Sequence, residues 1–304
     1  MLLLAIYSIL ACGYADHILG QLYAARCRNE IAQEGVQVTS LLLGWTLLLE
    51  ALIESRRFAK PVMQDAWIWI ALYFATYLVF DYFLHTNEEA YVLVLLGTLI
   101  MLVVLVAHMA VRCHRLILAS KIEGDLLPER VYCRYALRWL LVGVVASFSS
   151  LAFGLLGYGL IEAFDHLIGP FFFGAGATWD MATPLVIGAC SAASMYVFYR
   201  IGMALPTLAL GRRRLSMRES WCFTRRISRP LIWICVACGL FFAIYVSVWT
   251  FIEEFFAPTS FYEHDRYSAT DFVLSLASVA MEILCTLIGG SLFSVLYRAA
   301  CETV

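Results

Sequence analysis

Long apolar runs alternate with short polar segments along most of this chain. The runs cover about 62–84, 90–111, 136–160, 184–205, 230–252 and 271–297, and the charged residues gather mainly between them. An α-helix needs about 20 apolar residues to cross the hydrocarbon core of a bilayer. The pattern therefore predicts an all-α, polytopic transmembrane bundle with six core spanning helices.

The beginning of the chain follows this pattern less clearly. Residues 1–23 form an apolar run interrupted by charge, and residues 36–57 hold an apolar stretch that is too short to span and contains Glu50. We interpret 1–23 as a weak spanning helix and 36–57 as an interfacial or re-entrant helix. Together they form an N-terminal part, 1–57, ahead of a six-helix transmembrane domain at 58–304.

The loops between the runs differ sharply in charge. Sixteen Lys and Arg residues lie in three of them, 55–62, 112–138 and 206–229. One basic residue lies in the other three, 85–90, 162–183 and 253–270. Because Lys and Arg are retained on the cytoplasmic side, we expect the first three loops and the C-terminus to face the cytoplasm.

The six helices group into three similar pairs. The second helix of each pair ends in a ring side chain followed by arginine, at His114-Arg115, Tyr199-Arg200 and Tyr297-Arg298. This spacing predicts three tandem hairpins. We place them at about 62–111, 136–210 and 229–298.

Two segments between the pairs have an amphipathic pattern, Leu127–Arg138 and Leu215–Ser228. In the second, we expect Met217, Trp221 and Phe223 to face lipid while the arginines face water. Such segments are typical of short helices on the cytoplasmic surface of a membrane.

Composition supports a membrane location and limits the function classes. Hydrophobic residues make up 62% of the chain and charged residues 14%, whereas soluble domains have about 25% charged residues. The net charge of −2 hides a strong asymmetry along the chain; with the basic residues placed at one membrane surface, we expect lipid headgroups and no nucleic acid as partners. We interpret the ten cysteines as reduced thiols and small apolar residues.

Glu282 is the residue most suggestive of function. It lies near the middle of the last apolar run, where an acid costs roughly 2.5–3.5 kcal/mol, so it needs a partner. Hydroxyls at similar depth are those of Ser278, Thr286, Ser147, Ser149, Ser150, Ser191 and Ser194. Three roles remain open for Glu282: holding helices together, relaying a proton or ion, and contacting a lipid or substrate.

Arginines form the second group of candidates. His108, Arg112 and Arg115 recur at helical spacing and share a face. Together with the other inner-end arginines they either anchor the helices to headgroups or form a basic ring that holds a phosphate. The candidate anion or headgroup contacts are Arg112, Arg115, Arg200, Arg212, Arg213, Arg214, Arg225, Arg226 and Arg298.

No pattern in the sequence indicates an enzyme. Of the six histidines we place only His108 inside the bilayer, and a bis-histidine haem needs two. The Cys235/Cys238 pair has no second pair to complete a metal site, so we interpret it as core packing. We expect no catalytic residue, no metal and no cofactor.

The segment from Arg200 to Arg226 resembles a motif of the YciC-type group of bacterial inner-membrane proteins, and is similar to the membrane portion of some glycerophosphodiester phosphodiesterases. The motif comprises Arg200, Leu205-Pro206, Ala209-Leu210-Gly211 and Ser216 to Trp221. The likeness covers about 100–300; residues 1–57 depart from the group, and no phosphodiesterase catalytic domain is present. It implies a multi-pass inner-membrane fold and no established activity.

These observations lead to two hypotheses of function. The first is a non-enzymatic inner-membrane protein with a structural, accessory or envelope-homeostasis role, which binds anionic lipid headgroups or a membrane-protein complex, including further copies of itself. The alternative is a transporter or permease component for a small solute or lipid, in which Glu282 couples movement to protons.

Overall fold

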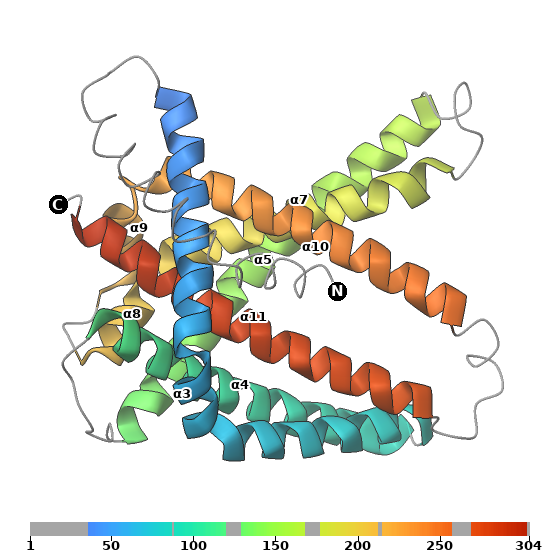
Figure 1. Ribbon diagram of the computed structural model, residues 1–304. Helices are drawn as coiled ribbons and strands as arrows, with labels where there is room; N and C mark the ends of the chain where they lie inside the picture. The colour runs from blue at the N-terminus through green and yellow to red at the C-terminus, as the bar shows by residue number, and fades with distance from the viewer. Residues whose placement is uncertain are drawn as a thin grey trace.

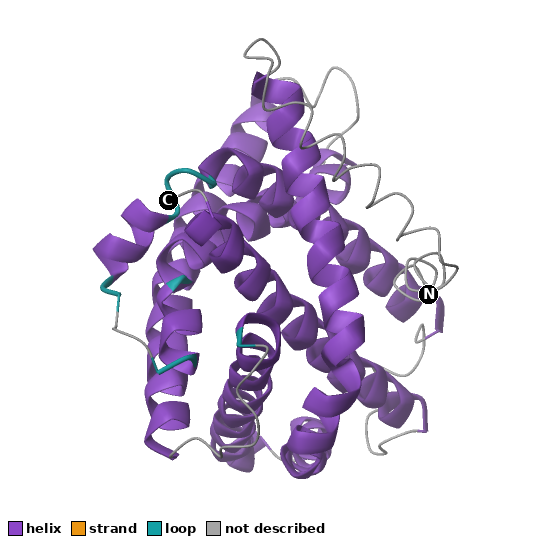
Figure 2. Ribbon diagram, turned by 60° about the vertical axis from the view of Figure 1, so that its left-hand side comes forward, coloured by secondary structure: helices purple, strands orange, loops and turns teal. Residues whose placement is uncertain are grey.

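The computed structural model describes residues 36–86, 88–119, 129–167, 177–211, 215–256 and 269–302, and every regular element in these ranges is a helix (Figure 2). The helices are α3 (Val36–Thr86), α4 (Glu88–Leu118), α5 (Glu129–Leu167), α7 (Ala177–Gly202), α8 (Ala204–Ala209), α9 (Met217–Phe223), α10 (Ser228–Phe256) and α11 (Ala269–Glu302). The weak spanning helix predicted at 1–23 lies outside the described residues.

Among the described residues, six helices are long and apolar enough to cross a membrane. They are α3, α4, α5, α7, α10 and α11. In hydrocarbon every backbone polar group must be satisfied within its own segment, which an α-helix achieves. The predicted all-α bundle with six spanning helices is thus confirmed.

Helix α3 joins two segments that the sequence pattern separates. It is continuous over 51 residues, more than twice the length needed to span a bilayer. Pro61 lies inside it and lacks a backbone donor, which favours a bend. In Figure 1 the first part of α3 crosses the other long helices steeply, and the second part turns to run beside α4 and α11. The boundary predicted at residue 57 therefore falls inside one continuous helix.

Two of the three expected hairpins are packed pairs. The second part of α3 packs against α4, and α5 packs against α7. The consecutive helices α10 and α11 instead pack mainly on other elements: α10 on α7 and α3, and α11 on α3 and α4. This arrangement brings α3 and α11, which are far apart in sequence, into direct contact.

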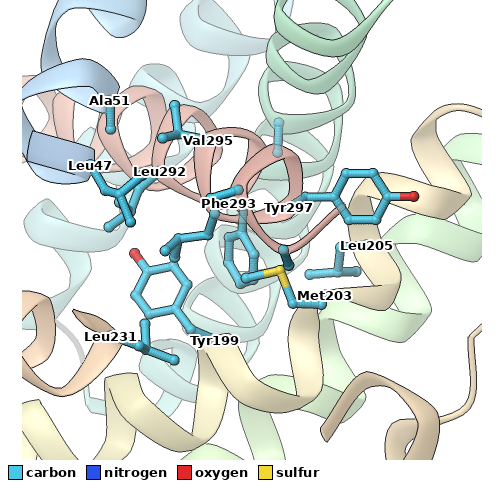
Figure 3. Packing of buried hydrophobic residues seen from close by; sticks show 14 of the residues in the cluster. Leu47, Ala51, Tyr199, Met203, Leu205, Leu231, Leu292, Phe293, Val295 and Tyr297 are labelled. Atoms are coloured by element: carbon cyan, nitrogen blue, oxygen red, sulfur yellow. The ribbon is translucent and has the colours of Figure 1, made fainter. Parts of the chain in front are cut away.

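Most of the buried core lies towards one end of the bundle. It includes Leu47, Tyr199, Met203, Leu292 and Phe293, from α3, α7 and α11 and the turn before α8 (Figure 3). This end also carries α8, α9 and the C-terminus (Figure 1). We call it the arginine-rich end because it holds Arg112, Arg115, Arg200, Arg218, Arg225, Arg226 and Arg298.

Towards the opposite end the helices diverge (Figure 1). Large apolar side chains are exposed there, including Leu93, Leu155, Leu160, Leu240, Ile244 and Val273. Exposed apolar surface on this scale is stable in lipid and not in water. The bundle is therefore tight at one end and open to lipid at the other.

Helices α7 and α10 approach closely through small residues. A Cβ added to Gly239 would lie 2.4 Å from the Gly188 carbonyl oxygen and 2.8 Å from Ala192 Cβ. A Cβ on Gly188 would lie 2.9 Å from Ala243 Cβ. The Gly188/Ala192 pair thus meets a matching Gly239/Ala243 pair, and this backbone contact holds the two helices together.

Candidate functional site

Glu282 lies on α11 and faces α3. The hydroxyl of Tyr73, which is 1% exposed, donates a hydrogen bond to Glu282 Oε2. One turn further on, the Thr286 hydroxyl donates to the Glu282 backbone oxygen at 2.8 Å. The acid therefore has a buried hydroxyl partner, which offsets part of the cost of placing it at mid-span.

This partner differs from the serines that the sequence suggested. The hydroxyls of Ser149 and Ser194 both donate to the Ala146 carbonyl, at 2.6 and 3.0 Å, within the α5–α7 contact. The other serines that the sequence suggested on α5 and α7 are Ser147, Ser150 and Ser191. Because Glu282 lies in the α3–α11 contact instead, the predicted partners from α5 and α7 are corrected to Tyr73.

Two further polar pairs continue from this pair along the same contact. The Ser275 hydroxyl donates to Asp81 Oδ2 at 2.5 Å, and between the two bonded pairs the side chain of Tyr77 interacts with that of Ser278. Residues at three- and four-residue steps share a helix face, so each helix contributes one polar stripe. We call these six residues the polar seam: Tyr73, Tyr77 and Asp81 on α3, and Ser275, Ser278 and Glu282 on α11.

The polar seam extends in one direction only. Asp81 lies eight residues beyond Tyr73, or about 12 Å along the helix, near the end of the candidate span at Phe83. In the other direction Tyr73 packs in a cluster with Val62, Met109 and Leu287, which are 0%, 0% and 4% exposed. The seam therefore connects the helix middle to the end opposite the arginine-rich end.

A cavity of about 850 Å³ lies between α3, α4 and α5 at the arginine-rich end. Its polar lining consists of Asp65, His108, Arg112, Arg115 and Glu129, and the remainder is mainly apolar and aromatic. Small-molecule sites typically measure 300–1,000 Å³, so the volume suits a ligand. His108, Arg112 and Arg115 line this one cavity, as expected for a shared helix face.

His108 lies between two aromatic rings in this cavity. Its ring centroid is 4.4 Å from that of Tyr132, in a stacked arrangement, and 4.8 Å from that of Trp69. Its Nδ1 lies 3.1 Å from the Val104 carbonyl oxygen, which can only accept a hydrogen bond. Nδ1 therefore carries the proton, and in the neutral ring Nε2 is the acceptor.

The cavity carries both signs of charge. Arg112 Nε lies 2.5 Å from Asp65 Oδ2 in an ion pair whose side chains are 36% and 51% exposed. Arg115 and Glu129 add a second group of each sign to the lining. An ion pair this exposed contributes little to the free energy of unfolding. Replacing it by contacts of Arg112 and Asp65 with the charged groups of a ligand therefore costs little free energy.

Arg200 is buried beneath α9. Its Nη2 donates to the Trp221 carbonyl at 2.8 Å, and its Nη1 donates to the Tyr196 hydroxyl at 3.0 Å. The Ser220 hydroxyl donates back to the Arg200 carbonyl at 2.9 Å. The guanidinium of Arg200 thus holds α9 against the end of α7. The sequence did not indicate this role.

Local sequence explains why α9 forms at this place. Gly211 has φ 66°, a conformation that other residues adopt only with strain, and it turns the chain after α8. Ser216 accepts from the Glu219 backbone N–H at 3.1 Å, and Glu219 Oε2 accepts from the Ser216 N–H at 2.6 Å, which completes a capping box. The motif from Arg200 to Trp221 is therefore a short helix with its cap and its anchor.

The orientation of α9 differs from the prediction at one residue. Trp221 is exposed, as expected, but Phe223 packs against Tyr297 with 5.6 Å between ring centroids. Phe223 therefore faces the protein rather than lipid, because α9 is held down by the buried Ser220 and by Arg200.

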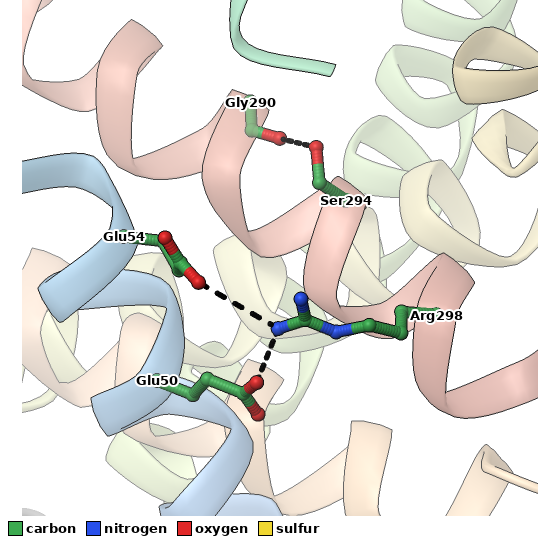
Figure 4. A network of polar contacts seen from close by, with 5 residues as sticks. All are labelled: Glu50, Glu54, Gly290, Ser294 and Arg298. Atoms are coloured by element: carbon green, nitrogen blue, oxygen red, sulfur yellow. Dashed lines mark hydrogen bonds and ion pairs between the residues drawn. The ribbon is translucent and has the colours of Figure 1, made fainter. Parts of the chain in front are cut away.

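Arg298 is paired with two acids of α3 (Figure 4). Its Nη2 contacts Glu50 Oε1 and lies 3.9 Å from Glu54 Oε1. This contact ties the last helix to the first part of α3. It also gives a partner to Glu50, the acid that interrupts the predicted interfacial segment.

The remaining candidate arginines lie at the surface or outside the described part of the chain. Arg225 and Arg226 are exposed in the turn between α9 and α10. Arg212, Arg213 and Arg214 lie outside the described residues.

Sequence reasoning missed His114, which is fully buried. Its Nδ1 lies 2.8 Å from Ser294 Oγ and its Nε2 lies 2.9 Å from the Tyr135 hydroxyl. The group links α4, α5 and α11. His114 was missed because Arg115 follows it, and we interpreted His114-Arg115 as the end of a helix that faces water.

The structure leaves two places where chemistry is concentrated, the polar seam and the cavity at the arginine-rich end. Comparison with models of protein families, with curated proteins and with solved structures gives no match to this chain. The side chains of the polar seam and of the cavity are therefore the basis for a proposal of function.

Proposed function

We propose that this chain is a non-enzymatic, lipid-binding protein of a bacterial inner membrane, with its C-terminus in the cytoplasm and a structural, accessory or envelope-homeostasis role. In this proposal the cavity between α3, α4 and α5 holds the headgroup of a phospholipid. The observation that carries it is a cavity of about 850 Å³ that combines two arginines, two acids and an aromatic wall.

The charges of the lining favour a headgroup that bears both a phosphate and an amine. Guanidinium groups bind phosphate oxygens through paired hydrogen bonds, so Arg112 and Arg115 suit the phosphate. Asp65 and Glu129 suit a primary ammonium group. The two signs offset each other in this lining, which suits a zwitterionic lipid such as phosphatidylethanolamine better than a purely anionic one.

The surroundings of the cavity suit the rest of a lipid. Trp69, His108 and Tyr132 give the cavity a flat, partly polar wall, which suits the glycerol and ester groups of a lipid. Leu137 and Leu141 of α5 are 71% and 47% exposed and offer apolar surface along which acyl chains can pack.

The location in the membrane is supported by charge. The exposed Arg218, Arg225 and Arg226 lie at the same end of the bundle as the cavity. Basic residues near an anionic membrane surface each contribute about 1 kcal/mol of attraction. This favours the arginine-rich end as the cytoplasmic one.

Lipid analysis of the purified protein tests the proposal. After detergent washing, the wild type is expected to retain phosphatidylethanolamine, measured by mass spectrometry as moles of lipid per mole of protein. The double variant Arg112→Gln/Arg115→Gln should retain at least about tenfold less, because two charge-assisted hydrogen-bond donors are lost. The control is Arg225→Gln/Arg226→Gln, which removes the same charge from exposed positions outside the cavity. Equal retention by both double variants would contradict the proposal.

A second candidate function is a transporter or permease component in which Glu282 takes up and releases a proton. The specific observation that favours it is the hydrogen bond from Tyr73 to a carboxylate at mid-span. Ionisable residues at this depth are costly and commonly mark ion or substrate routes. Glu282→Gln would then abolish pH-dependent flux, whereas a purely structural Glu282 would tolerate the change.

A further inference from the structure

We propose that the polar seam is a proton path that leads to Glu282 from the membrane side opposite the arginine-rich end. This inference rests on the second candidate function in one respect: both require that Glu282 gains and loses a proton. It assigns a direction of access and an entry group, Asp81, that the sequence did not single out.

The chemistry of the six residues suits proton transfer. Hydroxyl groups each donate one hydrogen bond and accept others, and a carboxylate becomes a donor once it is protonated. A hydroxyl can therefore accept a proton on one side while it releases its own on the other. A proton taken up by the Asp81 carboxylate can be passed along the serine and tyrosine hydroxyls, each of which forms one O–H bond and breaks another. The net change is that the Glu282 carboxylate becomes a carboxylic acid and the Asp81 carboxylate is restored.

The spacing of the seam is suited to bridging by water. Its three facing pairs, Asp81 with Ser275, Tyr77 with Ser278, and Tyr73 with Glu282, follow one another at one-turn intervals. Side chains one turn apart are about 5–6 Å from each other at Cβ. A single water can bridge such a gap, and the half-buried positions of Asp81, Ser278 and Glu282 leave access for it.

The direction follows from packing. Beyond Glu282 towards the arginine-rich end, the cluster of Val62, Met109 and Leu287 is almost fully buried and apolar. Towards the other end the helices diverge and the seam continues to Asp81 (Figure 1). The polar side chains beside Glu282 thus lead towards one side of the membrane, whereas towards the other side Glu282 meets mainly buried apolar side chains, of which Val62 also lines the cavity at the arginine-rich end.

The other titratable groups near the seam are few among the described residues. Tyr245 of α10 interacts electrostatically with Tyr77, and Cys285 of α11 interacts with Glu282. From α4, the buried Thr98 hydroxyl contacts the Thr76 carbonyl of α3 at 3.3 Å, and the thiol of Cys113 lies in the same cluster as Tyr73.

Time-resolved infrared spectroscopy of proteoliposomes tests the path. A membrane-impermeant caged acid is photolysed on one side, and protonation of Glu282 is followed as the carboxylic C=O band that Glu282→Gln removes. We expect the band to rise promptly when acid is released on the side opposite the arginine-rich end, and slowly from the other side. Tyr77→Phe and Asp81→Asn should each slow the rise by at least about tenfold, since each removes one group from a hydrogen-bonded chain. Tyr82→Phe is the matched control, because Tyr82 lies on another face of α3 and is 50% exposed.

The outcomes distinguish failure of the proton path from failure of the second candidate function. If the band rises equally fast in Tyr77→Phe, Asp81→Asn and the wild type, the path is wrong while protonation of Glu282 stands. If no band is lost in Glu282→Gln, or the band is constant after photolysis on either side, Glu282 does not change protonation, and both the path and the second candidate function fail. A thermal unfolding midpoint within a few degrees of wild type establishes that each variant is folded. None of these results bears on the lipid cavity.

Discussion

The guanidinium of Arg200 lies over the indole ring of Trp221, with 4.3 Å between Cζ and the ring centroid. The same side chain donates to the backbone carbonyl of Trp221, so one residue holds α9 both through its ring and through its main chain. Lysine has the charge but neither the planar stacking surface nor the two separate nitrogens with which Arg200 reaches Tyr196 and Trp221.

Arg200→Lys should therefore loosen α9 from α7. We expect a loss of about 1–3 kcal/mol in the free energy of unfolding, the value of hydrogen bonds to a buried charged group. The readouts are thermal unfolding in detergent and trypsin cleavage within 217–227. Arg218→Lys, at an exposed position of the same helix, is the control and should leave both unchanged. Identical cleavage in the two variants would contradict the docking role.

Gly239→Ala should weaken the contact between α7 and α10. The new Cβ would lie 2.4 Å from a backbone oxygen, which cannot rotate away, so the two helices must move apart. Overpacking of this kind costs about 1–3 kcal/mol. Gly143→Ala is a matched control, because its Cβ meets nothing within 4 Å and alanine favours a helix. The comparison of the two unfolding midpoints checks the prediction, which fails if Gly239→Ala is as stable as Gly143→Ala.

The buried His114 group should show coupling between its members. The Ser294 hydroxyl donates to the Gly290 carbonyl at 2.9 Å, so His114 Nδ1–H donates to Ser294, and Nε2 accepts from Tyr135. His114→Leu leaves the Tyr135 hydroxyl without that acceptor, which costs about 1–3 kcal/mol beyond any loss of packing.

Tyr135→Phe should then cost less in the His114→Leu background than in the wild type. A double-mutant cycle on unfolding free energies measures the difference, and we expect a coupling of about 1 kcal/mol. Strict additivity would show that the two side chains do not depend on each other.

Native cysteines allow the orientation to be measured without new labels. Cys222 and Cys301 are exposed thiols at the arginine-rich end. If this end is cytoplasmic, a membrane-impermeant maleimide will leave both unmodified in intact spheroplasts and modify both in inverted vesicles, as read by peptide mass spectrometry. Modification in intact spheroplasts would place the arginine-rich end outside and would reverse the direction of every proposal above.

Several features of the fold follow from short stretches of sequence. The six spans were predictable because the length of hydrocarbon to be crossed sets the length of each apolar run. The capping box of α9 was readable from a serine and a glutamate three residues apart.

The candidate sites were only partly predictable. Glu282 was identified from its cost in the bilayer, but its partner Tyr73 is 209 positions away in the chain. The shared face of His108, Arg112 and Arg115 was predicted from spacing along one helix, whereas the cavity that it lines also needs α3 and α5.

By itself, then, the sequence determined which segments are helices that can cross a membrane, and which end of the bundle carries the arginines. These are local properties, because they depend on the solvation of each segment and on charges close to it. The tertiary structure alone decided that α11 packs on α3 rather than on α10, that Arg200 and His114 are buried, and that Asp81 lies in line with Glu282. In lipid, apolar side chains have nearly the same free energy on every face of a helix, so the choice of neighbour depends on how closely whole helix surfaces fit, which no single segment contains.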